Sequence, residues 1–215
     1  INDCWPVISW SSIDYCGRWK ALHYYAKRFF APVMISCEEE SWMTAEANMN
    51  RQHFVFPKSI RLHVANETME TRKIQVKWQI RNAKAQILRE EENIVVVSPM
   101  SGQWLEKVKL PEINVFCEYV SYEAWEAGEK ISEGTTIFSY PKYFRYEDPK
   151  LSFSINNDEI TVTANAYAKS VEIQNENQDL VLSDNYFDLN SNSRTVKILR
   201  GNSTGIRVRS VYQIR

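Results

Sequence analysis

Residues 73–80 read Lys-Ile-Gln-Val-Lys-Trp-Gln-Ile, and this stretch decides the fold. Its apolar side chains stand at every second position, and Lys or Gln fills each position between them. Successive side chains of a strand point to opposite faces of a sheet, so a period of two is typical of an antiparallel strand with one buried face. The sequence therefore predicts a strand of a β-sandwich here.

Similar short runs lie on both sides of this stretch, with turn residues between them. Several short strands separated by turn signals are typical of an immunoglobulin-like sandwich. We place this first sandwich at residues 31–146. The further strands expected in it are 60–64, 93–97, 113–119 and 135–140.

A second set of runs follows a hinge at residues 146–150, and we place a small immunoglobulin-like sandwich at 147–215. A domain of about 65 residues buries little apolar surface, so we expect it to depend on a neighbour for stability. The strands expected in it are 151–155, 160–164, 171–174, 195–199 and 206–214.

One amphipathic helix precedes both sandwiches, at residues 17–30. Its apolar residues recur at helical spacing, and Pro32 ends it. Residues 1–6, Ile-Asn-Asp-Cys-Trp-Pro, are interpreted as the second half of a buried strand. The expected fold is mainly β, two antiparallel sandwiches after one helix. The apolar residues of the helix are Trp19, Leu22, Ala26, Phe29 and Phe30.

Composition excludes several classes of function. The formal net charge of the 215 residues is −1, which gives no electrostatic attraction to nucleic acid or to an anionic membrane. No apolar run approaches the roughly 20 residues of a membrane span. With only six glycines and no phosphate-binding fingerprint, we expect no nucleotide and no other cofactor.

The cysteines form no Cys-x-x-Cys pair, and the histidines are scattered, so we expect no metal site. Free thiols favour a reducing compartment, and the cytoplasm is the favoured location, although the sequence does not fix it. The residues concerned are Cys4, Cys16, Cys37, Cys117, His23, His53 and His63.

Two runs of glutamate, 38–40 and 90–92, are the places to look for a catalytic carboxylate pair. Runs of like charge repel and stay hydrated, so we expect each run to be an acidic surface loop. No motif indicates a nucleophile with its base. We assign no catalytic residue to this chain.

Residues 183–189, Ser-Asp-Asn-Tyr-Phe-Asp-Leu, resemble a signature of the small C-terminal sandwich in family 2 glycoside hydrolases, the β-mannosidase branch in particular. Residues 166–173 and 138–143 fit the same region. Residues 1–6 resemble the end of the stretch that closes the (β/α)₈ barrel of these enzymes. Residues 190–192, Asn-Ser-Asn, depart from the family, which usually has Pro and Gly in that turn.

The resemblance implies that the chain is the C-terminal part of a retaining β-mannosidase, with residues 1–30 the last strand and helix of the barrel. The parent enzyme would remove terminal non-reducing β-D-mannose from oligosaccharides by means of two upstream glutamates. The partner of this chain would be the missing N-terminal barrel. Lacking both glutamates, the chain itself is expected to be inactive.

The resemblance also suggests where a sugar would lie. At the mouth of the last barrel strand, the substrate would contact Asn2, Asp3 and Trp5. In the competing interpretation, Asn2 and Asp3 hold the loop by side-chain hydrogen bonds and Trp5 is a core residue. Asp184 and Tyr186, with Asp188, carry the same ambiguity, and we favour packing over ligand contact for them.

Two alternative functions remain open from the sequence. One is a stand-alone immunoglobulin-like carbohydrate-binding or adhesion module. The other is the same part of a family 2 β-galactosidase or β-glucuronidase. The stretch at residues 183–189 argues against these other enzymes, and the helix argues against the module, because a free module has no use for it. Without the barrel, part of the apolar stripe of the helix loses its cover, so we expect the helix to fold back on the first sandwich or to pair with a second copy in a homodimer.

Overall fold

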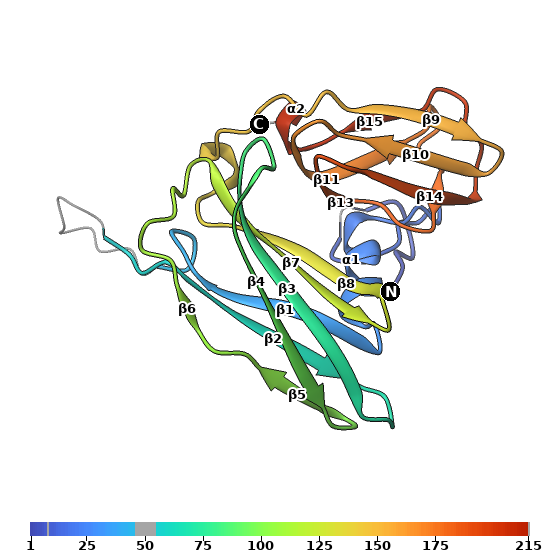
Figure 1. Ribbon diagram of the computed structural model, residues 1–215. Coiled ribbons are helices and arrows are strands. Elements are labelled where there is room, and N and C mark those ends of the chain that lie inside the picture. Colours follow the sequence, from blue (N-terminus) through green and yellow to red (C-terminus); the bar gives the residue numbers. More distant parts are fainter. Residues whose placement is uncertain (8, 46–54, 215) are drawn as a thin grey trace. The chain divides into compact units, whose positions relative to one another are not determined.

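The computed structural model describes residues 1–7, 9–45 and 55–214, so His53 lies outside the described residues. The chain divides into two compact units, one made of Ala31–Arg145 and the other of Ile1–Phe30 together with Tyr146–Arg215. Both are built of antiparallel sheets, which confirms the mainly β fold with its one long N-terminal helix (Figure 1).

The unit Ala31–Arg145 is a sandwich of two antiparallel sheets (Figure 1). One sheet has the order β4-β3-β7-β8, with β3 at Arg72–Asn82, β4 at Ile87–Val97, β7 at Glu118–Glu126 and β8 at Glu129–Ile137. The other has the order β1-β2-β5, with β1 at Val33–Glu40, β2 at Ser59–Asn66 and β5 at Ser101–Trp104, and β6 at Val108–Lys109 also pairs with β2.

The core of this sandwich lies between the inner faces of β3 and β2. Ile74, Val76 and Trp78 of β3 are at most 2% exposed. Ile60 and Leu62 of β2 join them in one apolar cluster. Burial of such a side chain contributes about 1.5–3 kcal/mol, so the alternation read from the sequence accounts for this part of the fold.

Two sequence predictions for this unit were wrong. Residues 113–117 form turns and not a strand, because the carbonyl of Asn114 accepts from the amides of Cys117 at 3.1 Å and Glu118 at 2.8 Å, and β7 begins only at Glu118. The two glutamate runs are not loops. They lie within β1 and β4.

The second sandwich also has two antiparallel sheets (Figure 1). One has the order β12-β14-β10-β9, with β9 at Ser152–Asn156, β10 at Glu159–Thr163, β12 at Val181–Leu182 and β14 at Ser193–Arg200. The other has the order β13-β11-β15, with β11 at Tyr167–Gln174, β13 at Phe187–Asn190 and β15 at Arg207–Arg209.

The expected last strand at 206–214 is shorter than predicted. β15 ends at Arg209, and the short helix α2 follows at Val211–Ile214. The side chain of Gln213 turns back to accept from the amide of Ser210 at 2.7 Å and from its hydroxyl at 2.9 Å. These two bonds hold Ser210 at the start of a helical turn where alternation alone indicated a strand.

Helix α1, Ala21–Phe29, belongs to the unit of the second sandwich, and not to the first sandwich as we expected. Its buried residue is Tyr24, 1% exposed, which joins the core of that sandwich. Leu22 and Phe29, both 47% exposed, and Phe30, 74% exposed, leave the predicted apolar stripe largely uncovered.

Residues 1–6 do not form the buried strand predicted for them. Asn2 makes an isolated parallel bridge with Ile13, and Ile1 is 92% exposed.

Candidate functional site

Asp3 is the buried residue of the predicted site. Its side chain is 4% exposed and accepts from Lys20 Nζ at 3.0 Å and from the Ser9 hydroxyl. Lys20 also donates to the Ser11 hydroxyl at 2.9 Å. The hydrogen bond from Ser9, supported by that from Lys20, holds the pKa of Asp3 below its usual value. Asp3 therefore ties the first residues to the start of α1.

Asn2 and Trp5 are placed differently. Asn2 is exposed, and its amide donates to the carbonyl of Asp3 at 3.3 Å. Trp5 is 70% exposed, so it is not the core residue of the competing interpretation, and the neighbouring Trp10 is 98% exposed. The predicted trio thus comprises one buried carboxylate with its own partners and two side chains open to solvent.

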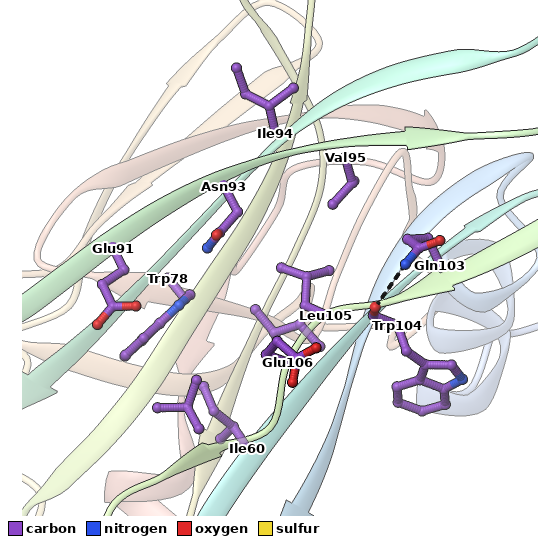
Figure 2. Close-up of a pocket in the computed structure, with 12 residues that line it drawn as sticks. Ile60, Trp78, Glu91, Asn93, Ile94, Val95, Gln103, Trp104, Leu105 and Glu106 are labelled. Atoms are coloured by element: carbon purple, nitrogen blue, oxygen red, sulfur yellow. Dashed lines mark hydrogen bonds between the residues drawn. The ribbon is translucent and has the colours of Figure 1, made fainter.

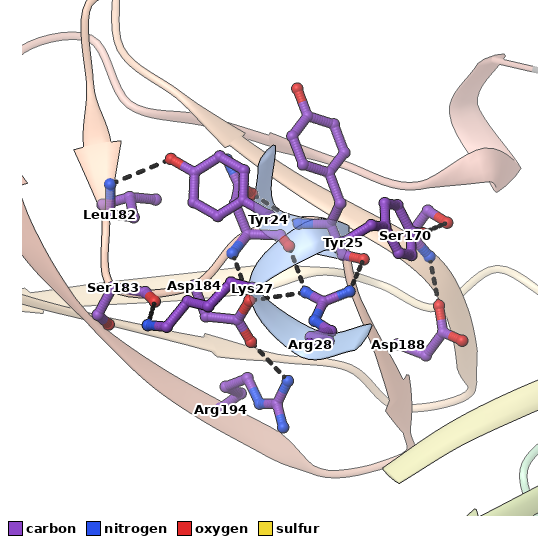
Figure 3. A network of polar contacts seen from close by, with 12 residues as sticks. Tyr24, Tyr25, Lys27, Arg28, Ser170, Leu182, Ser183, Asp184, Asp188 and Arg194 are labelled. Atoms are coloured by element: carbon purple, nitrogen blue, oxygen red, sulfur yellow. Dashed lines mark hydrogen bonds and ion pairs between the residues drawn. The ribbon is translucent and has the colours of Figure 1, made fainter. Parts of the chain in front are cut away.

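The basic residues of α1 fasten the helix to the second sandwich (Figure 3). Arg28 pairs with Asp184 at 2.7 Å, and Arg194 of β14 contacts the other oxygen of the same carboxylate at 3.0 Å. Lys27 donates to the carbonyl of Ser183 at 2.8 Å.

The hydroxyl of Tyr24 accepts from the amide of Leu182 at 3.2 Å. Burial raises the pKa of Tyr24, so this phenol stays neutral as a partner.

The signature at residues 183–189 has a structural role at nearly every position. Asn185 pairs with the main chain of Ile173 through both its oxygen, at 2.9 Å, and its nitrogen, at 3.0 Å. The hydroxyl of Tyr186 donates to Glu172 at 2.8 Å, and burial raises its pKa. Phe187 and Leu189 are each 1% exposed in the core.

Asp188 completes this set by accepting from the amide of Ser170 at 2.7 Å (Figure 3). These contacts favour packing over ligand contact for the whole signature.

A pocket of about 310 Å³ lies in the first sandwich, between the edge strands of its two sheets (Figure 2). Its floor is apolar: Val95, Leu105 and Val108 line it, are half-buried, and pack against the core of the sandwich. Its walls come from β4 on one side and from residues 103–108 on the other. We call this pocket the edge groove. Its polar lining residues are Glu91, Asn93, Gln103 and Glu106.

The sequence did not reveal the edge groove. Glu91 pairs across the sheet with Trp78, and Asn93 pairs with Val76, so both occupy inner-face positions that a sandwich usually fills with apolar residues. Figure 2 shows their side chains pointing from β4 toward Trp78, whereas Ile94 points the other way. Only the register of β4 against β3 shows that these residues face inward. That register was not predicted, because residues 90–92 were expected to form an acidic loop.

The outer glutamates of the same run have ordinary partners. Lys77 contacts Glu90 at 3.4 Å and Glu92 at 3.3 Å across the strand pair. In β1, Glu40 accepts from Ser59 at 2.6 Å and pairs with Lys107 at 2.8 Å. These carboxylates are held as ion pairs on strands.

Among residues 1–7, 9–45 and 55–214, no three His, Cys, Asp or Glu side chains gather as a metal site would require. Cys37, which is not disulfide-bonded, has its pKa raised to about 12 by burial. Within the same described ranges, no helix is long and apolar enough to cross a membrane.

Two family models match the chain. A mannosidase Ig/CBM-like domain matches residues 58–143, and an Ig-fold domain of mannosidases matches residues 146–214. β-Mannosidase B of Aspergillus flavus is 25% identical over 202 residues, which is 88% of this chain and 23% of that protein. The β-mannosidase of Mus musculus is 38% identical over 66 residues, 29% of this chain and 7% of the relative. The β-mannosidase of Capra hircus is 59% identical over 34 residues, which is 16% of this chain and 4% of that relative.

The chain thus spans no more than 23% of the length of these relatives. Among solved structures, the β-D-mannosidase from Dictyoglomus thermophilum aligns with 97% of this chain and 25% of its own, at a TM-score of 0.73 and 19% identity. The exo-chitosanase of Amycolatopsis orientalis aligns with 97% of this chain and 30% of its own, at a TM-score of 0.59 and 12% identity. At these identities the two structures show a shared fold. Together the matches confirm the resemblance seen at residues 183–189.

Proposed function

We propose that this chain, whose two sandwich domains each match a family model of a mannosidase domain, is the non-catalytic C-terminal part of a retaining family 2 β-mannosidase. The longer enzyme would remove terminal non-reducing β-D-mannose from oligosaccharides. Retention requires two carboxylates roughly 5 Å apart, one as nucleophile and one as acid and base. We assign both to the longer protein and neither to this chain.

The observation that carries this proposal is the pair of family matches, which cover residues 58–143 and 146–214 with domains of mannosidases. The relatives named above are all β-mannosidases, which favours this enzyme over a β-galactosidase or β-glucuronidase. The contacts of residues 183–189 support it physically, because they explain what the signature does in the fold.

We assign residues 1–30 to the end of the catalytic barrel of the longer enzyme, as its last strand and helix. They expose Trp5, Trp10 and Phe30, which are 70%, 98% and 74% exposed. Side chains of this size and apolar character would be covered in the complete barrel. We propose that these side chains pack against the rest of the barrel, and that Asp3 holds the loop while Asn2 and Trp5 reach the substrate.

A stand-alone carbohydrate-binding or adhesion module is the second candidate. In the sequence, the helix argues against this candidate, because a free module has no use for it. Tyr24 completes the core of the second sandwich, so the helix fits either candidate equally. The edge groove favours the module reading, while the family matches favour the enzyme.

An assay with p-nitrophenyl β-mannoside separates the candidates. This chain alone should release no p-nitrophenol, while the longer protein encoded with it should hydrolyse the β-mannoside and leave the β-galactoside and β-glucuronide intact. A longer protein without β-mannosidase activity would contradict the proposal. So would turnover by the purified chain that is abolished by Glu91→Gln but kept by the matched surface change Glu112→Gln.

A further inference from the structure

We propose that the edge groove is a saccharide-binding site for a neutral mono- or disaccharide. Its volume, about 310 Å³, stands at the lower end of the roughly 300–1,000 Å³ of pockets that bind small molecules. Such pockets combine an apolar lining with a few polar groups that fix orientation. The groove has both parts in one place.

The apolar part is its floor. Val95 and Val108 are half-buried and pack on the sandwich core, whose residues Ile60, Leu62 and Trp78 lie beneath and are at most 2% exposed, so the floor is preformed. Leu105 packs against the same core and lines the groove with the two valines. A sugar ring presents carbon-bound hydrogens on its faces, and such a face fits an apolar floor. The ring hydroxyls then lie at the rim.

The polar part is the rim, and it has hydrogen-bonding capacity to spare. The side chain of Gln103 uses its nitrogen on the carbonyl of Trp104 at 3.0 Å, which leaves its oxygen available. The exposed side chains of Asn93 and Glu106 have no hydrogen-bond partner among the described residues. Amides and carboxylates accept from hydroxyls, and amides also donate to them, as recognition of a polyhydroxylated ring requires.

The charge of the lining restricts the ligand further. Its charged members are Glu91 and Glu106, and no Lys, Arg or His stands among the twelve described residues that line it. Arg89, on the same strand, donates to Glu91 at 3.1 Å, and its guanidinium lies 5.1 Å from the centroid of the Trp78 ring, so this cation is already engaged. A phosphate, a sulfated sugar or a uronic acid would meet a carboxylate without a free cation, so the site favours uncharged sugars.

The choice of mannose among neutral sugars rests on the proposed function, whereas the site itself rests on the geometry of the groove. β-1,4-Mannobiose is therefore the first probe. Cellobiose, galactose, glucuronate and inorganic phosphate complete the panel.

The test is an NMR titration of the ¹⁵N-labelled chain with each probe. We expect mannobiose to shift the amides of residues 91–95 and 103–106 with a dissociation constant in the millimolar range, and glucuronate and phosphate to leave them unmoved. Asn93→Val combined with Glu106→Gln should weaken binding at least tenfold. The matched controls Gln75→Val, on the outer face of β3, and Glu112→Gln, on a surface turn, should bind as the wild type does.

Several results would overturn the site. They are no shift with any neutral sugar, shifts confined to residues outside the groove, tighter binding of glucuronate than of mannobiose, or undiminished binding by the double variant. If Asn93→Val leaves binding intact but makes the chain self-associate, the polar residues serve only to protect an edge strand, and the proposal fails. Binding of cellobiose without mannobiose would keep the saccharide site and reject the mannoside, independently of the activity assay on the longer protein.

Discussion

The two sandwiches of this chain complete their cores in different ways. The buried core of the first comes entirely from residues 35–138 of its own unit. The core of the second includes Tyr24, and Trp19 packs against it, so it draws on a segment that precedes the first sandwich in the sequence. The smaller sandwich offers less apolar surface of its own, and a helix from elsewhere in the chain makes up the difference.

The largest effect is expected from Tyr24→Ala. The change removes a ring that is 1% exposed and leaves the amide of Leu182 without its acceptor. Loss of a buried aromatic costs about 3–5 kcal/mol, so the second sandwich should unfold at a markedly lower temperature while the first keeps its transition. Calorimetry follows both transitions. Tyr25→Ala, at a position 40% exposed, should cost under about 1 kcal/mol, and equal losses at the two sites would contradict this division.

Asp184→Ala should have the next largest effect on the same sandwich. The carboxylate accepts from Arg28 and Arg194, and hydrogen bonds to charged groups contribute about 1.5–3 kcal/mol. All three side chains are about a quarter to a third exposed, so solvent screening reduces the expected loss to about 1–2 kcal/mol. Urea unfolding measures it, with Asp158→Ala, in an exposed turn, as the control. An unchanged midpoint would show that the helix is not held by this ion pair.

The sequence predicted the first sandwich better than the residues that join the helix to the second. Strand β3 followed directly from its alternation, because one face is buried and the other wet. The turns at residues 113–117 were missed, because their apolar residues alternate while Asn114 organises the main chain around itself. The helix stripe was read from apolar residues alone, whereas the contacts are made by a tyrosine and two cations whose partners lie more than 150 residues away.

The candidate sites show the same limit. The sequence predicted Asp3 as either a substrate ligand or a loop anchor. It did not indicate the residues that hydrogen-bond to this carboxylate, which are Ser9 and Lys20. The edge groove was hidden because Glu91 belongs to a run of like charges. The two outer glutamates of the run pair with Lys77, and that pairing depends on the register of two strands.

Substitutions on the outer face of α1 should change association and not stability. We predict that the chain pairs with a second copy through this face when the barrel is absent. The double variant Leu22→Lys/Phe29→Lys should then be monomeric and alter the free energy of unfolding by under about 0.5 kcal/mol, since both side chains are half exposed. Sedimentation velocity measures the outcome, with Lys84→Glu, in an exposed turn of the first sandwich, as a charge control. A monomeric wild type would refute the pairing.

The smallest effect is a dependence on acidity. The folded pKa of Asp3 lies below the ordinary 3.8, so its stabilising contribution is present above that pH and is lost as the pH falls through the folded pKa. Below that pH, the melting temperature of the unit that contains α1 should fall less steeply in Asp3→Asn than in the wild type. We call this fall the acid limb. Asp158→Asn should leave the limb as in the wild type, and an identical limb in the Asp3 variant would exclude the contribution.

The contrast between the sandwiches is tested most directly by removing residues 1–30 and following amide hydrogen exchange across the remaining chain. Exchange reports the opening of each element separately. The account predicts that β10, β11 and β14 lose most of their protection while β3 and β7 keep theirs. Full protection of β10, β11 and β14 without residues 1–30 would contradict it, as would an equal loss in both sandwiches.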